Sequence, residues 1–283
     1  MTVVYVHGGV SGIPDLEPVD LGFAVAAAAG AGTALDAVEA AIRSLEDHPR
    51  LNAGHGSTVN RDGELELDAG LADGATGRVG AVANVRVEHP ITLARRVLED
   101  TPHLLIAGRG AEELGSDMRK LDELTPAVRA RLERARADGS LDLASYGDPE
   151  DVDTVGAVAL DGEGNLAAGS STGGVFGKMR GRVGDSPVFG AGFYAARDVA
   201  VVGTGVGEVF LKVLACLRVA WLVEEGVHPQ EACEQVVALV RARADVPAGL
   251  LALDVLGRSG AAFRGGSLGV AGPDGLVEPV KLF

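Results

Sequence analysis

A threonine stands at the boundary between two contrasting stretches of the chain. Residues before Thr154 are rich in Asp, Glu and Arg, whereas Val-Gly-Ala-Val-Ala-Leu directly after it predicts a buried strand. A threonine hydroxyl is a poor nucleophile unless a base lies beside it. Cleavage between Asp153 and Thr154 would create that base, because an α-amine has a reference pKa of ~7.7–8.0, close to neutral pH. If the chain is not cut, Thr154 is an ordinary β-branched residue at the start of a strand.

A second hydroxyl-bearing segment, Ser-Ser-Thr-Gly-Gly at 170–174, ends the next predicted strand. Paired glycines let the backbone approach a ligand closely, so Thr172 is a candidate to face a pocket. The alternative is a plain glycine turn.

Further along, Arg182 and Asp185 lie three residues apart in a glycine-containing loop. They are suited to a zwitterion, with the guanidinium binding a carboxylate and the carboxylate binding an ammonium. The alternative is a surface ion pair worth little energy.

A third segment, Gly-Thr-Gly-Val-Gly-Glu at 203–208, follows a predicted strand and opens a predicted helix. Its glycines suggest dinucleotide binding, but Glu208 occupies the position where that fingerprint requires a third glycine. A strand-to-helix turn still presents backbone N–H groups at a helix N-terminus. Those groups are suited to stabilising an oxyanion.

The elements that must position these residues follow from hydrophobic periodicity and turn residues. We predict helices at 34–47, with Thr33 as its N-cap, and at 91–99, 106–119, 207–224 and 229–244. A hairpin is predicted at 57–69, with its turn at Arg61-Asp62-Gly63. Other strands are predicted at 2–7, 79–85, 154–160, 166–171, 198–203, 250–255, 261–264, 267–271 and 276–280. Strands at both ends with helices between them favour a layered α/β sandwich.

One region differs from the rest, the charged stretch 116–153. Leu121, Leu124, Val128 and Leu132 have the spacing of one amphipathic helix, and the remainder is predicted to be an exposed linker. A chain of 283 residues is otherwise best explained as one compact domain.

The composition argues against several classes of function. A formal net charge of −15 without a basic stripe argues against nucleic-acid binding. Because no run of about 18 apolar residues occurs, we expect no membrane span. The residues after Met1 lack the features of a secretory signal. Cys216 and Cys233 lack metal-ligand spacing and are predicted to be reduced core residues, so a cytoplasmic protein is expected.

Taken in order, the motifs resemble the plant-type (type III) L-asparaginase and isoaspartyl peptidase family of N-terminal-nucleophile (Ntn) hydrolases. The resemblance covers nearly the whole chain except the linker, and its segments are His7-Gly8-Gly9, 45–56, Leu67-Asp68-Ala69, 153–161, 171–174, 181–187 and 203–208. It implies an α+β fold, a four-layer αββα sandwich. It also implies a single-domain precursor that cuts itself into an alpha subunit, 1–153, and a beta subunit, 154–283.

The resemblance implies a role for each candidate residue. Thr154 would first attack the carbonyl of Asp153 to cut the chain. It would then attack the side-chain carbonyl of L-asparagine or of a β-aspartyl (isoaspartyl) dipeptide, forming a β-aspartyl ester. Thr172 would hydrogen-bond the nucleophile, and Asn52 would lie beside it.

By the same resemblance, the remaining site residues would bind the substrate. Arg182 would bind its α-carboxylate and Asp185 its α-ammonium. Thr204 and Gly205 would line the oxyanion hole, and Gly207 would contact the substrate. Two departures from the usual pattern, Val10-Ser11-Gly12 after the opening motif and Val206, affect residues expected to shape the leaving-group side of the pocket.

The family also suggests a structural sodium, no catalytic cofactor, and a homodimer of cleaved alpha-beta units. The sodium would be held by backbone carbonyls of Leu45, Glu46, His48, Leu51, Ala53 and His55. The alternative for this segment is a proline-terminated helix end without an ion.

Hydrolases resembling glycosylasparaginase or threonine aspartase remain alternatives for the enzyme. An uncleaved amino-acid-binding protein is the alternative outside the enzymes.

Overall fold

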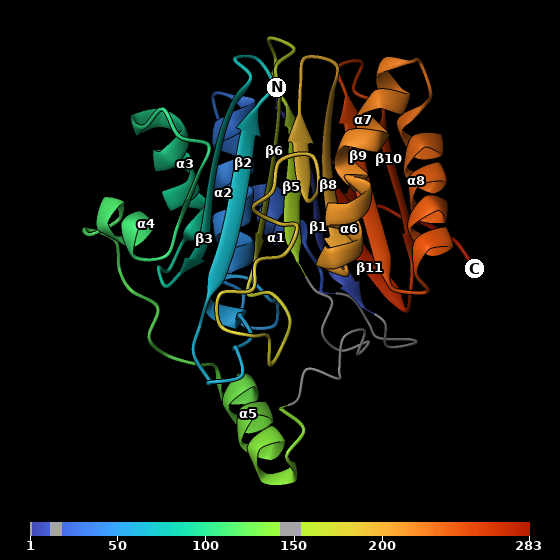
Figure 1. Ribbon diagram of the computed structural model, residues 1–283. Coiled ribbons are helices and arrows are strands. Elements are labelled where there is room, and N and C mark those ends of the chain that lie inside the picture. The colour runs from blue at the N-terminus through green and yellow to red at the C-terminus, as the bar shows by residue number, and fades with distance from the viewer. Residues whose placement is uncertain (1, 12–18, 142–153) are drawn as a thin grey trace.

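The computed structural model describes residues 2–11, 19–141 and 154–283 (Figure 1). Two β-sheets pack against each other, and helices cover their outer faces. This mixed architecture confirms the predicted α+β class. In the described residues no helix is both long and apolar enough to cross a membrane.

The larger sheet carries most of the strands that precede residue 173. Its strands are antiparallel except for the β3–β4 pair. Within the described ranges it has eight strands, in the order β12 (Gly275–Leu276), β11 (Ser267–Gly272), β1 (Val3–Ser11), β5 (Val155–Leu160), β6 (Leu166–Thr172), β2 (Leu67–Asp73), β3 (Arg78–Val85) and β4 (Leu105–Ala107). The strand after Thr154 is therefore central, between β1 and β6.

The smaller sheet is formed by the C-terminal part of the chain. Its order in the described residues is β13 (Val280–Lys281), β10 (Ser259–Arg264), β9 (Ala248–Asp254), β8 (Val199–Gly205) and β7 (Phe193–Ala195). Side chains alternate between the two faces of a strand. Val158 and Ala168 of the larger sheet share one apolar cluster with Val202 and Leu251 of the smaller sheet. We call the face of the larger sheet that bears Val158 and Ala168 its inner face.

Helices pack on the opposite faces of both sheets. On the larger sheet lie α1 (Gly22–Ala27), α2 (Ala34–Glu46) and α3 (Pro90–Asp100), and on the smaller sheet lie α7 (Ala215–Glu224) and α8 (Pro229–Arg243). Thr33 caps α2 as predicted, because its side chain accepts a hydrogen bond from the Asp36 N–H. A Cβ on Gly169 would lie 2.8 Å from Val38 Cγ1, so this glycine allows α2 to pack closely on β6.

Several predicted elements are wrong in part. The strand at 276–280 is divided into β12 and β13, which belong to different sheets. Residues 57–66 form no strand, because the Asn60 side chain accepts hydrogen bonds from the backbone N–H groups of Asp62 and Glu64, and β2 begins only at Leu67. The helix at 106–119 is reduced to α4 (Arg109–Leu114), preceded by β4. The helix at 207–224 is divided into α6 (Gly207–Val213) and α7 by Leu214, whose φ of 52° is left-handed.

The charged stretch contains the helix expected there, with different limits. Helix α5 (Pro126–Asp138) begins after Thr125, whose side chain accepts from the Val128 N–H. Leu132 and Ala135 are buried, and the Arg131 guanidinium lies 4.1 Å from the centre of the Phe176 ring. Leu121 and Leu124 precede the helix rather than belong to it. Residues 142–153 of the predicted linker, including Asp153, lie outside the described residues.

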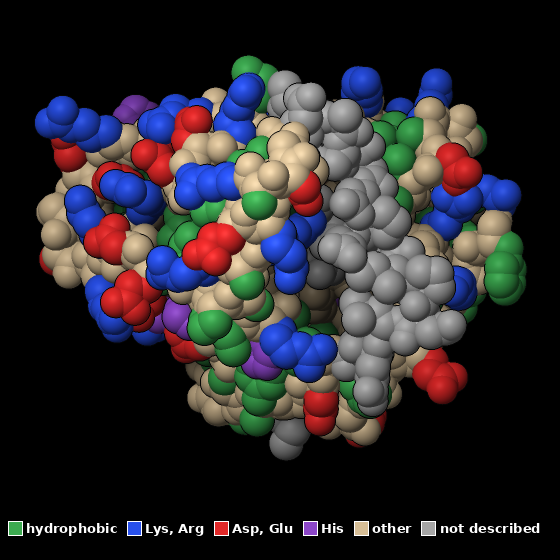
Figure 2. Space-filling view, turned by 90° about the horizontal axis from the view of Figure 1, so that it is seen from below, with side chains coloured by type: hydrophobic (Ala, Val, Ile, Leu, Met, Phe, Trp, Pro, Cys, Tyr) green, Lys and Arg blue, Asp and Glu red, His purple; other side chains and the backbone are tan. Residues whose placement is uncertain are grey.

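Charged side chains of both signs are interspersed over the lower end of the molecule (Figure 2). Exposed ion pairs include Arg180 with Asp62 at 3.1 Å and Arg119 with Glu88 at 3.0 Å. Solvent-exposed pairs of this kind contribute only about 0–1 kcal/mol to stability. The stability of the fold therefore depends mainly on the apolar layers between sheets and helices.

Candidate active site

Thr154 and Thr172 face each other on the inner face of the larger sheet. Val155 of β5 pairs with Ser171 of β6, which puts Thr154 opposite Thr172 one residue further along. Thr154 Oγ1 donates a hydrogen bond to Thr172 Oγ1 at 3.2 Å, and both residues are buried. We call these two residues the hydroxyl pair. Their contact results from strand register, because directly opposed side chains project from the same face.

The turn after Thr172 holds the second hydroxyl in place. Thr172 Oγ1 accepts a hydrogen bond from the Gly174 N–H at 3.0 Å, and Asn52 Nδ2 donates to the Gly174 carbonyl at 2.7 Å. The Asn52 carbonyl accepts from the Gly173 N–H at 3.0 Å. A Cβ on Gly173 would lie 2.5 Å from Asn52 Oδ1, so only glycine fits at this position. The structure therefore brings Asn52 into contact with the turn that follows the hydroxyl pair.

His7 of β1 is buried on the other side of β5. It pairs with Gly156, and a side chain on that glycine would collide with the imidazole. Burial lowers the pKa of His7 to about 4, so the ring is neutral at neutral pH. A neutral ring can lie next to β5 without adding a buried charge.

Thr204 and Gly205 come from the smaller sheet. Thr204 is buried at the end of β8, and its Oγ1 accepts a hydrogen bond from the Val10 N–H of β1 at 3.3 Å. A Cβ on Gly205 would lie 2.5 Å from Phe210 Cε2, so a side chain there would displace this phenylalanine of α6. The two sheets thus meet near this end of β1, and β8 packs on β5.

Arg182 and Asp185 lie in the segment Gly181–Pro187, which we call the charged loop. The Arg182 side chain pairs with Glu208, because its Nε and Nη2 donate to the Glu208 carboxylate, each at 2.9 Å. A Cβ on Gly207 would lie 2.8 Å from Arg182 Nη2 and 3.0 Å from Asp185 Oδ1. The start of α6 therefore lies directly against both charged side chains.

The electrostatics of the charged loop are set by burial. Asp185 is buried, and its Oδ2 has no hydrogen-bond partner among the described residues. Burial raises the pKa of Asp185 to about 7, although the positive charge of Arg182 opposes this shift. Glu208 already neutralises much of the Arg182 charge. At neutral pH the Asp185 carboxyl is therefore divided between its protonated and ionised forms.

Several residues of the site are not among those predicted from the sequence. In the sequence, Glu208 is distinguished only as a mismatch to a nucleotide-binding fingerprint. Two buried charged side chains, Asp68 and Lys178, were also not predicted to belong to the site. Asp68 stood inside one of the family-like motifs, which was the only sequence signal for it. No spacing pattern distinguishes Lys178.

The loop that follows α2 contains the carbonyls predicted to bind sodium. The carbonyls of Leu45, His48, Leu51 and Ala53 all accept backbone hydrogen bonds, and a carbonyl oxygen has two lone pairs. The His48 and Leu51 carbonyls converge on Gly56, where a Cβ would have no room. Among the described residues no group of three or more His, Cys, Asp or Glu side chains is arranged to hold a metal ion. A cation in this loop would therefore be held by the backbone.

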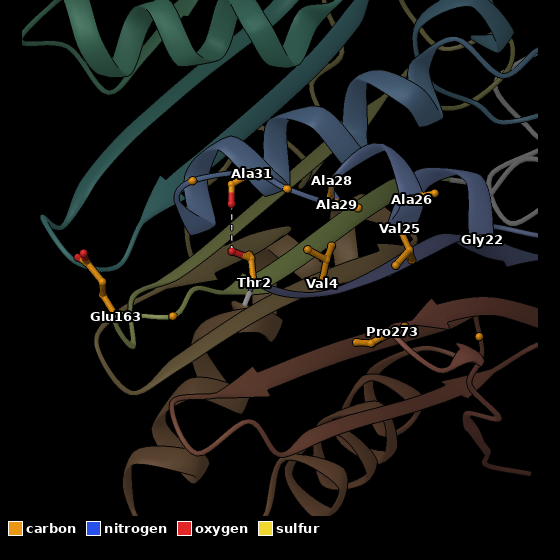
Figure 3. Close-up of a pocket in the computed structure, with 15 residues that line it drawn as sticks. Thr2, Val4, Gly22, Val25, Ala26, Ala28, Ala29, Ala31, Glu163 and Pro273 are labelled. Carbon is orange, nitrogen blue, oxygen red and sulfur yellow. Dashed lines mark hydrogen bonds between the residues drawn. The ribbon is translucent and has the colours of Figure 1, made fainter.

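A separate hollow of about 750 Å³ lies between α1, the start of β1 and the turn after β11 (Figure 3). Alanine and glycine residues form most of its wall. Thr2 Oγ1 donates to the Ala31 carbonyl at 3.2 Å, and Glu163 lies at the rim. None of the candidate site residues lines this hollow. Its described lining residues contain no nucleophile–base arrangement.

Comparisons with known proteins agree with this arrangement. Residues 19–271 match the protein family described as asparaginase. The isoaspartyl peptidase/L-asparaginase of Rattus norvegicus is 40% identical over 275 residues, which cover 90% of this chain and 81% of the rat protein. The isoaspartyl peptidase of Salmonella typhimurium is 46% identical over 234 residues, covering 78% of this chain and 75% of that protein. That of Escherichia coli is 43% identical over 235 residues, covering 78% and 73%.

A hydroxyl pair between two sheets, beside a charged loop, is an arrangement suited to a hydrolase with a threonine nucleophile. The family match spans most of the chain, and the relatives are aligned over most of their own lengths. The chain belongs to the asparaginase family.

Proposed function

We propose that this protein is a self-processing threonine hydrolase that cleaves the side-chain amide of L-asparagine and of β-aspartyl dipeptides. The observation that carries the proposal is the buried hydrogen bond between Thr154 and Thr172 at the start of a central strand. The names of the relatives, isoaspartyl peptidase and L-asparaginase, supply the substrate class.

Self-processing would begin with attack of Thr154 Oγ1 on the carbonyl carbon of Asp153. Expulsion of the Thr154 nitrogen leaves an ester between Asp153 and the threonine oxygen. Water then hydrolyses this ester and releases the Asp153 carboxylate, a free hydroxyl and a free α-amine. The α-amine is the base that the nucleophile lacks in the uncut chain. The products are an alpha subunit, 1–153, and a beta subunit, 154–283, within one domain.

The fold proposed for this domain is the four-layer αββα sandwich of Ntn-hydrolases. Its support is the packing of helices α2 and α3 on the larger sheet and of α7 and α8 on the smaller one. In such a fold the central strand that follows the cleavage site carries the nucleophile at its first residue.

In the mature site the substrate would be held at its charged end. Arg182 binds the α-carboxylate, and Asp185 binds the α-ammonium, whose charge favours the ionised carboxyl. Thr154 Oγ1 attacks the β-carbonyl carbon while its proton passes to the α-amine of the same residue. Thr204 and Gly205 stabilise the oxyanion. The leaving amine takes up that proton, and water hydrolyses the β-aspartyl ester to aspartate. Holding both charges of the substrate places its carbonyl over one hydroxyl, which reduces the entropic part of the barrier.

A structural sodium in the loop after α2 belongs to this proposal. It would be bound by the backbone carbonyls of Leu45, Glu46, His48, Leu51, Ala53 and His55, and it would keep Asn52 in place beside the Gly173–Gly174 turn. No cofactor is needed for the chemistry. A homodimer of cleaved units and a cytoplasmic location complete the proposal, the latter supported by the buried free thiols of Cys216 and Cys233.

The test is a denaturing gel with intact mass spectrometry of the wild type beside Thr154→Ala. The chain of 28.8 kDa should give fragments of about 16 and 13 kDa, the smaller beginning at Thr154, while the variant stays whole. Assays with asparagine, a β-aspartyl dipeptide and glycosylated asparagine follow. A wild type that remains uncut after long incubation would contradict the proposal and favour an amino-acid-binding protein. Preference for glycosylated asparagine would favour the glycosylasparaginase alternative.

A further inference from the structure

Two buried charged residues lie beside the hydroxyl pair without a role in the chemistry proposed above. Asp68 of β2 pairs directly with Thr172 of β6, which in turn lies opposite Thr154. The three side chains therefore form a row across neighbouring strands β2, β6 and β5. All three project from the inner face, because directly opposed residues share a face.

The Asp68 carboxylate is only partly satisfied. Its Oδ1 accepts a hydrogen bond from the Asn84 N–H at 2.9 Å, whereas its Oδ2 has no partner among the described residues. The side chain is fully buried. A buried carboxylate that keeps an unused oxygen is costly. Such a group is retained more readily where its charge acts on a neighbour, and the neighbour across the ladder is Thr172.

Lys178 supplies the opposite charge. Its side chain is 2% exposed, and Nζ donates to the Glu66 carbonyl at 2.7 Å. A Cβ on Gly174 would lie 2.9 Å from Lys178 Nζ, so the ammonium rests against the turn that holds Thr172 and Asn52. Asp68 and Lys178 attract each other through the protein interior. Burial raises the pKa of Asp68, and the charge of Lys178 opposes that rise.

We propose that Asp68 and Lys178 are positioning residues for the hydroxyl pair. The negative charge of Asp68 turns the hydrogen of the Thr172 hydroxyl toward β2. One lone pair of Thr172 accepts from the Gly174 N–H, and the other then faces Thr154 and accepts its O–H until that proton passes to the α-amine. Lys178 balances the charge of Asp68 and packs against Gly174, which holds the turn. This inference rests on the proposed function of Thr154 and Thr172. It assigns both residues to the reaction step rather than to substrate capture.

The experiment compares Asp68→Asn, Lys178→Met and the double variant, all made in the full chain. Self-cleavage, kcat per cleaved chain, KM for a β-aspartyl dipeptide and melting temperature are measured for each. Asp68→Asn is isosteric and should lower kcat about tenfold or more with KM changed less than about twofold, as for loss of a group that acts on proton transfer. Lys178→Met should also lower the melting temperature, because it leaves a buried charge unbalanced.

The double variant separates positioning from stability. Removing both charges should bring the melting temperature back toward that of the wild type while kcat stays low. If kcat recovers together with the melting temperature, the two residues are only structural and the inference is wrong. It is equally wrong if Asp68→Asn keeps kcat and the cleavage rate within about twofold of the wild type. A variant that melts like the wild type but remains uncut supports the inference, since cleavage uses the same hydroxyl pair.

Asp254→Asn is the matched control. Asp254 is a buried carboxylate at the end of β9, and it accepts hydrogen bonds from the backbone N–H groups of Leu256 and Arg258. Its loss should lower the melting temperature and leave kcat per cleaved chain unchanged. Failure of the proposed function is visible separately, because the wild type itself would then stay uncut or inactive. If the wild type cleaves itself and hydrolyses the substrate, and the Asp68 and Lys178 variants do so equally well, this inference alone is contradicted.

Discussion

Thr172 ends one regular strand and Thr154 directly precedes another, whereas Arg182 and Asp185 stand in a loop that charges and glycines hold together. Thr154 and Thr172 meet because β5 and β6 pair in one register, and the contact would persist with many different neighbours. The charged loop depends on specific partners, since Glu208 engages two donors of Arg182 and Gly207 leaves room for both charged side chains. Strand register is suited to placing a nucleophile. A loop of compensating charges is suited to binding a zwitterion.

The difference has a kinetic consequence. Changes at the hydroxyl pair should appear in kcat, because these groups act mainly when bonds form and break. Changes in the charged loop should appear mainly in KM, because in the proposed mechanism its residues bind the end of the substrate that does not react. The following predictions test this division, from the largest expected effect to the smallest.

Replacement of Thr172 by valine should have the largest effect. It removes the hydroxyl that accepts from Thr154 while keeping a β-branched side chain on the strand, and kcat should fall about 10²–10⁴-fold. Steady-state kinetics per cleaved chain measures it. Ser170→Ala is the control, since Ser170 is buried two residues earlier on β6 and its Oγ has no partner among the described residues. A similar loss in both variants would assign the effect to packing.

Arg182→Lys should act chiefly on KM. Lysine cannot reproduce the forked contact with Glu208 or bind a carboxylate through two donors, so kcat/KM should fall about 10²-fold. Kinetics with a β-aspartyl dipeptide separates the two constants. Arg180→Lys changes an exposed neighbour in the same way and should have little effect. A fall confined to kcat would contradict the division between the two regions.

Gly173→Ala tests the turn that follows the hydroxyl pair. A Cβ there would meet Asn52 Oδ1 and the Ser57 side chain, so the turn must move by a few tenths of an ångström or more. Misplacement on this scale should lower kcat about tenfold or more. Gly110→Ala in α4, where a Cβ meets nothing closer than 3.7 Å, is the control and should behave like the wild type. Unchanged kcat in Gly173→Ala would show that the turn tolerates displacement.

The last prediction concerns pH, whose effect is smallest close to neutrality and grows on the acid side. In the proposed mechanism the ionised Asp185 carboxylate binds the substrate ammonium. Its raised pKa of about 7 means that the ionised fraction falls as the pH drops below 7. KM should therefore rise toward tenfold per pH unit on the acid side, with a smaller change in kcat. A pH profile of kcat/KM measures this. A KM independent of pH between 5 and 8 would contradict it.

The raised pKa of Asp185 also affects the stability of the fold. Rising pH, which is expected to favour substrate binding, should lower this contribution to stability. The folded-state pKa of Asp185 lies above its ordinary value of about 3.9, so the folded state binds more protons between those two values. Its contribution to stability therefore falls as the pH rises from about 4 to about 7. In Asp185→Asn this loss should disappear, and thermal denaturation at several pH values would show a flatter dependence.

Periodicity and turn residues predicted the elements with clear boundaries. Helix α2 lies where its apolar spacing and the Thr33 cap indicate, and α8 begins at Pro229 as expected. The failures occurred where a local pattern was overridden by contacts distant in sequence. Leu214 interrupts a helical pattern where the chain also contacts residues 190 and 191, through hydrogen bonds from the Leu217 and Cys216 N–H groups. No local signal encodes such a contact.

For the site, residue types and motif order determined that a threonine at position 154 is the candidate nucleophile, with Thr172, Arg182, Asp185 and Thr204 as its partners. Side-chain chemistry is local, and so it can be recognised from the sequence. Tertiary structure alone decided that Glu208 pairs with the Arg182 guanidinium, that Asp185 is buried, and that Asp68 and Lys178 adjoin the hydroxyl pair. Burial and register depend on which strands become neighbours, because β2 and β6 are separated by about a hundred residues in the chain yet place Asp68 directly opposite Thr172.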